Sequence, residues 1–327
     1  MNSGMPEIFS AVIPLYNKRP YIRRAVNSVL GQTFPDFELI IVDDGSTDGS
    51  HEVLADVKDP RYRLLRQANT GEGPARNAGM AAAKGQWIAF LDADDMWLPD
   101  HLAELSKIAA AHHAAGLIAT AIAEVTDGSL YQATSTHSGT IREVDYFLEA
   151  SRRIGLATSS SCAVSRRAFN SVAGFGTARA GADLEYWTRV ALQFPVAVSD
   201  RTTSVYFRGT GGVTETIAAE AKPLRPVATL ADLSPSLATL CAAAEREPAI
   251  LRRPGIRAYI NARIMSGIRG SLVRNDVLRA RSLARLMVQP LSLRDTLAVA
   301  ALHVPQGSLK AGLNLYHRGR NQLRRRV

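Results

Sequence analysis

The sequence predicts an α/β fold with a mixed, mainly parallel sheet, followed by a C-terminal helical extension. Over the first hundred residues, short apolar runs typical of buried strands alternate with segments of helical periodicity. Such alternation produces a parallel sheet with right-handed crossovers. From about residue 215 onward only helical patterns occur. We therefore expect an α/β domain over residues 1–214 and a basic α-helical region over residues 215–327.

Each expected strand is an apolar run that ends at a turn signal, as buried parallel strands do. The expected strands are 8–15, 37–42, 62–65, 87–91, 117–125 and 204–207. The expected helices carry their apolar residues on one face. They cover 20–30, 46–57, 73–83, about 100–115 and about 183–192, whereas 126–180 is mixed and rich in turns.

The C-terminal region contains one regular apolar stripe. Ile260, Ile264, Ile268 and Leu272 recur every four residues, the spacing of a single helix face. The pair Asn275-Asp276 can end that helix and cap a second one through about residue 287. This pattern predicts a helical hairpin.

Composition places the chain among ordinary globular proteins, with 46% hydrophobic and 21% charged residues. Cys162 and Cys241 are isolated and form neither a disulfide framework nor a metal-binding set, which favours a reducing cytosol. The N-terminus lacks the pattern of a signal peptide, and no run reaches the roughly 18 apolar residues of a membrane span. A cytoplasmic location is therefore expected.

The net charge of +9 is unevenly distributed along the chain. Residues 1–214 hold 20 basic and 23 acidic residues, whereas residues 215–327 hold 19 basic and 7 acidic residues. Such asymmetry indicates either an anionic partner surface, membrane or nucleic acid, or a solvated basic helical face. No nucleic-acid recognition motif accompanies it, so a peripheral membrane contact is the partner we expect.

Acidic residues gather where two expected strands end. The second strand runs into Asp43-Asp44, and the fourth is followed by Asp92, Asp94 and Asp95. Ligands of an open parallel sheet bind outside the carboxyl ends of its strands. Carboxylates this close repel one another unless a cation or hydrogen bonds compensate. Hard oxygen ligands select Mg²⁺ or Mn²⁺. In reactions that release a diphosphate, such an ion neutralises the negative charge that develops on this leaving group.

Five segments together resemble the family 2 glycosyltransferases of the GT-A fold. The matching segments are 10–17 (SAVIPLYN), 28–33 (SVLGQT), 38–48 (ELIIVDDGSTD), 69–79 (NTGEGPARNAG) and 89–95 (AFLDADD). The resemblance spans roughly residues 8–210. It implies a GT-A catalytic domain over residues 1–214, and the C-terminal region lies outside it.

The resemblance implies a nucleotide-sugar site with a role for each matching position. Asp44 would bind the base of a uridine- or thymidine-type nucleotide, Asp92 would face the ribose, and Asp94, in the Asp-x-Asp motif, would hold the metal. Asp95 would support the turn. Further donor-binding residues implied by the resemblance are Pro14, Tyr16, Asn17, Gly73, Arg76 and Asn77.

An inverting transfer also needs a base for the acceptor hydroxyl. Residues 181–189 (GADLEYWTR) resemble the family segment that carries this base, which would be Asp183. Ala182 stands where the family frequently has Glu, and Glu185 is the next candidate. Arg208 would meet the diphosphate, in a loop that has Thr210 where the family frequently has His.

The expected function is the metal-dependent transfer of one sugar from a UDP- or dTDP-linked donor to a glycan or lipid-linked acceptor in cell-surface polysaccharide synthesis. The Gln-x-x-Arg-Trp pattern of processive synthases is absent from the sequence. One alternative is a sugar-phosphate nucleotidyltransferase, although its glycine-rich signature is missing after the first strand. The other is a catalytically inactive module that binds nucleotide sugars.

Overall fold

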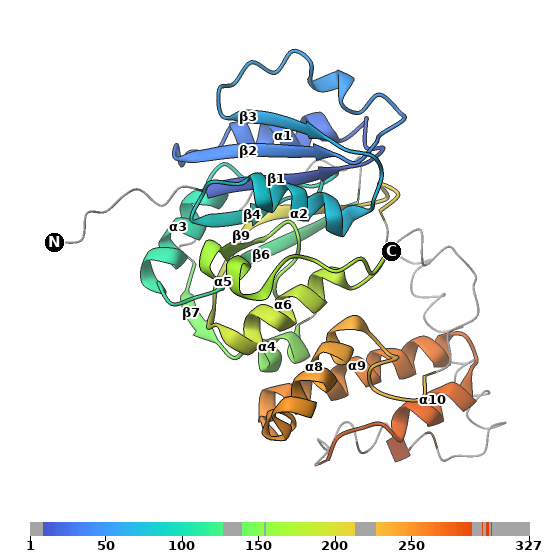
Figure 1. Ribbon diagram of the computed structural model, residues 1–327. Coiled ribbons are helices and arrows are strands. Elements are labelled where there is room, and N and C mark those ends of the chain that lie inside the picture. The colour runs from blue at the N-terminus through green and yellow to red at the C-terminus, as the bar shows by residue number, and fades with distance from the viewer. Residues whose placement is uncertain are drawn as a thin grey trace, which may run out of the picture. The chain divides into compact units, whose positions relative to one another are not determined.

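The computed structural model describes residues 9–126, 139–153, 155–212 and 227–289, together with 296, 299, 300 and 302. The chain divides into two compact units (Figure 1). The first combines residues 1–146 with 153–221, and the second combines residues 147–152 with 222–327. The boundary expected between residues 214 and 215 lies outside the described residues.

One nine-stranded mixed sheet forms the first unit, in the order β3-β2-β1-β4-β8-β6-β9-β5, with β7 paired to β9. The four strands from β3 to β4 are parallel, and β6 is parallel to β9, whereas β8, β5 and β7 pair antiparallel with their neighbours. This confirms the expected fold class. The strands are β1 (Phe9–Leu15), β2 (Phe37–Asp43), β3 (Tyr62–Arg66), β4 (Trp87–Phe90), β5 (Met96–Trp97), β6 (Leu117–Thr126), β7 (Ile141–Val144), β8 (Cys162–Ser165) and β9 (Val196–Arg208).

Helices pack on this sheet through small and apolar side chains. They are α1 (Ile22–Leu30), α2 (Glu72–Ala82), α3 (His101–Ala111), α5 (Arg166–Val172) and α6 (Ala182–Gln193). Every residue of β1 is buried, as expected for a central strand covered on both faces. Helix α2 approaches β1 so closely that a Cβ on Gly79 would lie 2.4 Å from Cγ1 of Val12. The close approach fixes α2 beside the strands whose ends carry the acids.

The prediction of a helix over 46–57 is wrong, because only the short 3₁₀ helix Glu52–Leu54 forms there. The segment forms turns that are stabilised by side-chain hydrogen bonds to the backbone. The Asp48 carboxylate accepts from the backbone N–H of Ser50 at 2.9 Å, and the Ser50 hydroxyl accepts from the backbone N–H of Lys18 at 2.9 Å. Gly49 adopts a φ of +78°, which interrupts a right-handed helix.

Several other boundaries differ from the sequence expectation. The mixed region 126–180 contains β7, α4 (Tyr146–Arg152), β8 and α5, and β5 was not expected. Strand β9 begins at Val196, eight residues before the expected start at 204. Its long pairing with β6 and β7 overrides the weak polar segment around residue 200.

The second unit contains α8 (Pro235–Arg246), the 3₁₀ helix Pro248–Arg252, α9 (Pro254–Val273) and α10 (Val277–Ala284), with most of α4. The expected hairpin forms between α9 and α10. Asn275 has a φ of +59° at the turn, and the Asp276 carboxylate accepts from the backbone N–H of Arg279 at 2.9 Å. Within this unit Phe147 of α4 packs edge-on against Tyr259 of α9, with ring centroids 5.6 Å apart. No helix in the described part of the chain combines the length and apolar character needed to span a membrane.

Candidate functional site

The sheet register brings the acid-bearing loops to one edge. Strand β1 lies between β2 and β4 and runs parallel to both, with Leu15 opposite Asp43 and Val12 opposite Phe90. The chain segments that follow these three strands therefore leave the sheet at the same edge. Asp44, the acidic turn 92–95 and Lys18 all belong to those segments.

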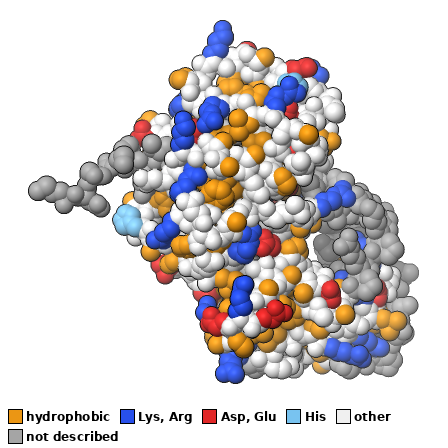
Figure 2. Space-filling model, viewed as in Figure 1, with side chains coloured by type: hydrophobic (Ala, Val, Ile, Leu, Met, Phe, Trp, Pro, Cys, Tyr) orange, Lys and Arg blue, Asp and Glu red, His pale blue; other side chains and the backbone are white. Residues whose placement is uncertain are grey.

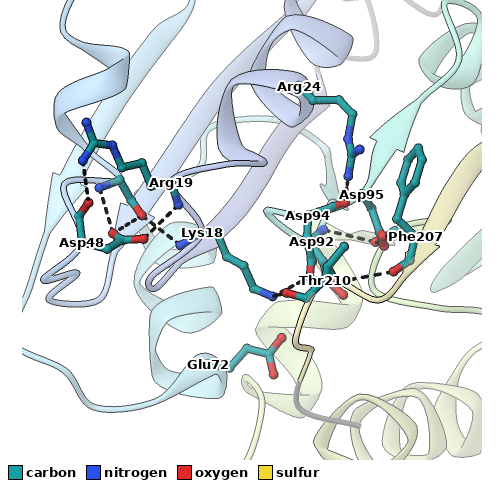
Figure 3. Close-up of polar contacts among 12 residues, drawn as sticks. Lys18, Arg19, Arg24, Asp48, Glu72, Asp92, Asp94, Asp95, Phe207 and Thr210 are labelled. Carbon is teal, nitrogen blue, oxygen red and sulfur yellow. Dashed lines mark hydrogen bonds and ion pairs between the residues drawn. The ribbon is translucent and has the colours of Figure 1, made fainter. Parts of the chain in front are cut away.

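Asp94 is held by a lysine that the sequence did not single out (Figure 3). Lys18 Nζ lies 2.6 Å from Oδ2 of Asp94 and donates to the backbone carbonyl of Thr210 at 3.1 Å. The Thr210 hydroxyl donates to the same Oδ2 at 2.7 Å. Asp94 is therefore joined to the loop after β1 and to the loop after β9.

Arg24 of α1 holds the same acidic turn through its backbone. Its guanidinium donates to the carbonyl oxygen of Asp94 and lies 3.6 Å from the centroid of the Phe207 ring. The cation and the aromatic face attract each other in this geometry. Arg24 thus connects α1, the acidic turn and β9.

Asp95 is fully buried, and its hydrogen bonds hold the acidic turn against neighbouring segments. Its carboxylate accepts from the Ser160 hydroxyl at 2.5 Å and from the backbone N–H of Phe207 at 3.0 Å. Ser160 also accepts from the backbone N–H of Asp92 at 3.2 Å. Burial raises the pKa of Asp95 well above its usual value, the charges of Asp92 and Asp94 raise it further, and the two hydrogen bonds oppose the rise.

Asp92 faces a buried arginine of α2. Arg76 Nη2 lies 2.6 Å from Oδ1 of Asp92 and 2.6 Å from Oε1 of Glu72. Burial raises the pKa of Asp92 to about 6, and Arg76 limits the rise. Burial disfavours the charged form of Arg76, but Glu72 and Asp92 outweigh this effect and raise the pKa of the guanidinium.

The Asp44 carboxylate is buried and accepts four hydrogen bonds. Oδ1 accepts from Gln67 Nε2 at 2.7 Å and from the backbone N–H and the hydroxyl of Thr70 at 3.0 and 3.3 Å. Oδ2 accepts from the backbone N–H of Gly71 at 2.8 Å. Because a carboxylate oxygen accepts about two hydrogen bonds, Oδ2 retains capacity for a further donor.

Two of the expected donor-binding residues, Gly73 and Asn77, contact the loop 174–176. A Cβ on Gly73 would lie 2.2 Å from the carbonyl oxygen of Gly176, so glycine is needed there for contact with protein backbone. Asn77 accepts from the backbone N–H of Phe175 at 2.7 Å and donates to its carbonyl at 2.9 Å. These contacts give Gly73 and Asn77 a structural role within the first unit.

Pro14, Tyr16 and Asn17 lie at the end of β1 and in the loop that follows. Tyr16 is 47% exposed, an unusual position for a large aromatic side chain. Asn17 adopts a φ of +49° and its side-chain oxygen accepts from the backbone N–H of Thr47 at 2.8 Å. Tyr16 therefore offers an open aromatic face beside an ordered turn.

Asp183 lies in the first turn of α6. Burial raises its pKa, while the backbone N–H of Leu184 and the charge of Arg76 oppose the rise. The charge of Arg76 also lowers the pKa of Asp92, so the same guanidinium acts on both carboxyl groups. Glu185, the other candidate base, is bound to Arg189 at 2.7 and 2.9 Å. Cys162 is buried nearby, and burial together with the charge of Asp183 raises the pKa of its thiol.

Arg208, expected to meet a diphosphate, forms an ion pair with Glu124. Both side chains lie at the end of the β6–β9 pairing, where Glu124 is opposite Tyr206 and Thr126 is opposite Arg208. Both are more than half exposed. This exposure leaves the arginine room to change partners.

The resemblance implies a divalent metal ion, and the carboxylates at this edge of the sheet are its candidate ligands. No group of three or more His, Cys, Asp or Glu residues suited to a metal occurs in the described ranges. Mg²⁺ typically takes only one or two carboxylates and completes its shell with water and substrate phosphates. Asp94 fits an ion held jointly with a diphosphate, with the Lys18 ammonium as its competitor for this carboxylate.

Sequence reasoning missed the residues that hold the acids in place: Lys18, Arg24 and Ser160. Lys18 could have been found, since it follows β1 directly and β1 is flanked by both acidic strand ends. Ser160 could not, because its contact with Asp95 spans 65 residues and crosses from β4 to the segment before β8.

Comparisons with known proteins agree with this geometry. Residues 10–172, just under half of the chain, match the family model "Glycosyl transferase family 2". An uncharacterized glycosyltransferase of a Nostoc species is 47% identical over 102 residues, which cover 30% of this chain and 32% of that protein. The succinoglycan biosynthesis protein ExoO of Rhizobium meliloti is 46% identical over 92 residues, 28% of this chain and 26% of ExoO. The similarity thus spans about a third or less of these relatives. Asp183 lies beyond residues 10–172, the segment that the family model matches.

Similarity in structure extends further along the chain. The S. aureus TarS complex with UDP-GlcNAc has a TM-score of 0.66 at 16% identity, over 95% of this chain and 92% of that one. The mannosyltransferase PcManGT from Pyrobaculum calidifontis, in complex with GDP-Man and Mn²⁺, has a TM-score of 0.50 at 18% identity, over 95% and 85%. These similarities establish the GT-A fold with C-terminal helices.

We expect Ser160→Ala to destabilise the first unit by about 1–3 kcal/mol, because a buried Asp95 oxygen loses its hydroxyl donor. Urea unfolding at neutral pH measures the change, and Ser159→Ala at a neighbouring buried serine is the control. A loss of stability no larger than that of Ser159→Ala would contradict the assignment.

Proposed function

We propose that the family 2 glycosyltransferase domain in residues 10–172 makes this chain an inverting, non-processive enzyme that transfers one sugar from a nucleotide-sugar donor. The observation that carries the proposal is that Asp44, Asp92 and Asp94 follow parallel strands that end at the same edge of the sheet. Ligands of open α/β sheets bind at such an edge. The sequence match covers this part of the chain.

The nucleotide proposed is UDP or dTDP. Asp44 Oδ2 has capacity for one more donor, and the N3–H of uracil or thymine is such a donor. The exposed ring of Tyr16 can stack on the base from the adjoining loop. Pro14 and Asn17 shape this loop, Asp92 accepts from the ribose, and Arg76 holds Asp92 in position.

Asp94 would hold Mn²⁺ or Mg²⁺ together with the diphosphate. When bound, such an ion neutralises the negative charge that develops on the leaving diphosphate. Lys18 would then give up Asp94, and its ammonium would remain beside the same negative charge. Arg208 is the further cation proposed for the diphosphate, after release from Glu124.

Asp183 is proposed as the catalytic base. It accepts the proton of the acceptor hydroxyl while that oxygen attacks the anomeric carbon and the nucleoside diphosphate leaves from the opposite face. The configuration at the anomeric carbon is inverted. The engagement of Glu185 by Arg189 favours Asp183 over Glu185 for this role.

The acceptor proposed is a glycan or lipid-linked glycan of cell-surface polysaccharide synthesis, reached at the cytoplasmic face of the membrane. The relative ExoO is named for succinoglycan biosynthesis, and residues 215–327 carry an excess of twelve positive charges. The last twenty residues, rich in arginine, lie outside the described residues.

We expect UDP with Mn²⁺ to bind more tightly than ADP with Mn²⁺, because Asp44 accepts from a pyrimidine N3–H and adenine has no ring N–H to donate. Binding raises the melting temperature of the native state, so a thermal-shift series with UDP, dTDP, GDP and ADP ranks the nucleotides. Hydrolysis of labelled UDP-sugars then distinguishes a transferase from an inactive binding module. Stronger stabilisation by ADP than by UDP would refute the assignment of Asp44.

Asp94→Asn should lose most of the Mn²⁺-dependent turnover, because a neutral amide is a much poorer ligand for a hard cation. We expect a decrease of about a hundredfold or more, of the size seen when one electrostatic contact to a transition state is removed. Asp36→Asn, at an exposed acid, is the matched control. Wild-type turnover in a folded Asp94→Asn protein would show that the metal assignment is wrong.

Asp183→Asn should abolish transfer while leaving UDP affinity nearly unchanged, since the base acts on the acceptor. In the wild type, kcat should fall in acid through a pKa above the ordinary aspartate value of 3.8, because burial raises the pKa of Asp183. Calorimetry of UDP binding and a pH–rate profile test both statements. An equal loss of UDP affinity would instead place Asp183 in the donor site, and Glu185→Gln serves as the comparison variant.

A further inference from the structure

Few large hydrophobic side chains are exposed in the described part of the chain, and two of them lie close together in sequence. Within the described ranges only three such side chains are exposed: Tyr16, Val273 and Leu278. Tyr16 lies in the proposed nucleotide site. Val273 is 60% exposed and Leu278 is 69% exposed, and they flank the three-residue turn between α9 and α10.

The two aliphatic side chains lie on the faces of the hairpin that point away from its own core. In α9 the buried positions include Ile264, Ile268 and Ser271, whereas 266, 269, 270 and 273 are exposed, as is the C-cap residue Arg274. In α10 the buried positions are Val277, Ala280 and Leu283, whereas 278 and 282 are exposed, as is the C-cap residue Arg285. Both exposed sets follow helical spacing, so each helix presents one outward stripe.

The charge on these outward stripes has one sign. They carry Arg269, Arg274 and Arg285 and no acidic residue. Between residues 252 and 289 the chain holds nine arginines and a single acid, Asp276, whose carboxylate is used to cap α10. In the space-filling view, blue basic and orange hydrophobic side chains lie over the C-terminal helices, with a few red acidic ones among them (Figure 2).

We propose that the end of the α9–α10 hairpin is a docking surface for an anionic lipid bilayer, with Val273 and Leu278 inserted among the headgroups and Arg269, Arg274 and Arg285 on lipid phosphates. This deepens the membrane location in the proposed function and assigns it to the hairpin end. Stable peripheral binding requires two signals, and a short apolar element beside a basic patch supplies both.

Two other occupants fit these residues less well. A second copy of this chain in a two-fold dimer would place the same arginines against each other, and two aliphatic side chains are few for a stable interface. A nucleic acid would use the arginines but would gain nothing from an exposed valine and leucine, and no aromatic side chain is available on the two stripes for base stacking. The combination of aliphatic and basic side chains favours lipid.

Co-sedimentation of the full-length protein with vesicles tests the proposal. We expect binding to phosphatidylcholine vesicles that contain phosphatidylglycerol, weak binding to phosphatidylcholine alone, and loss of binding at high salt. Arg269→Gln with Arg285→Gln should weaken the partition coefficient by about 25-fold, at about fivefold for each docked arginine. Val273→Ser with Leu278→Ser should also weaken it, about tenfold or more.

Arg246→Gln with Arg252→Gln removes the same charge from exposed positions of the same unit and should weaken binding far less. All three double variants should hydrolyse UDP-sugars in solution like the wild type, so that loss of membrane binding is separated from failure of the proposed chemistry. Equal losses in the control and the hairpin variants would overturn the proposal. Retained vesicle binding in both hairpin variants would also overturn it. The same holds if the property that these variants lose is self-association without vesicles, or DNA binding.

Discussion

Mutual repulsion among Asp92, Asp94 and Asp95 is the constraint around which the site is built. Three carboxylates within four residues follow a buried strand, and each is compensated in a different way. Asp92 has Arg76, Asp94 has Lys18 and Thr210, and Asp95 has a buried hydroxyl and a backbone N–H. The compensating groups come from α2, the loop after β1, the segment before β8 and the end of β9. The acidic turn is therefore bound by four segments of the first unit that lie far apart in sequence.

Close backbone approach is the second requirement of this unit. Helix α2 contacts β1 at Gly79 and the loop 174–176 at Gly73, and both contacts exclude a Cβ. The same loop is bound by Asn77, and the carbonyl of Gly174 accepts from Arg189 of α6. Because Arg76 is on α2 and Asp183 is on α6, these contacts set the spacing between the side proposed to bind the donor and the proposed base.

The fold class and the acidic edge could be read from the sequence because both depend on local patterns. Apolar runs locate the central strands within one or two residues, and the turn residues after them carry the acids. The antiparallel strands β5 and β8 and the early start of β9 depend on pairing with distant segments, which no local pattern encodes. The same limit applies to the site. Asp44, Asp92 and Asp94 are visible as strand-end acids, whereas the contacts of Gly73 and Asn77 with the loop 174–176 arise only when residues about a hundred positions apart meet.

The short helix α4 has a consequence for how this protein can change over evolutionary time. Its residues 147–152 lie in the middle of the catalytic sequence, yet they belong to the C-terminal unit, where Phe147 packs on Tyr259. A recombination event with a single crossover near residue 221 would exchange the C-terminal helices but leave α4 behind. The incoming helices would then meet an aromatic side chain that they were not selected to accommodate. Inheritance of the two units is therefore coupled, and new C-terminal regions should arise more readily by gradual substitution than by exchange of whole segments.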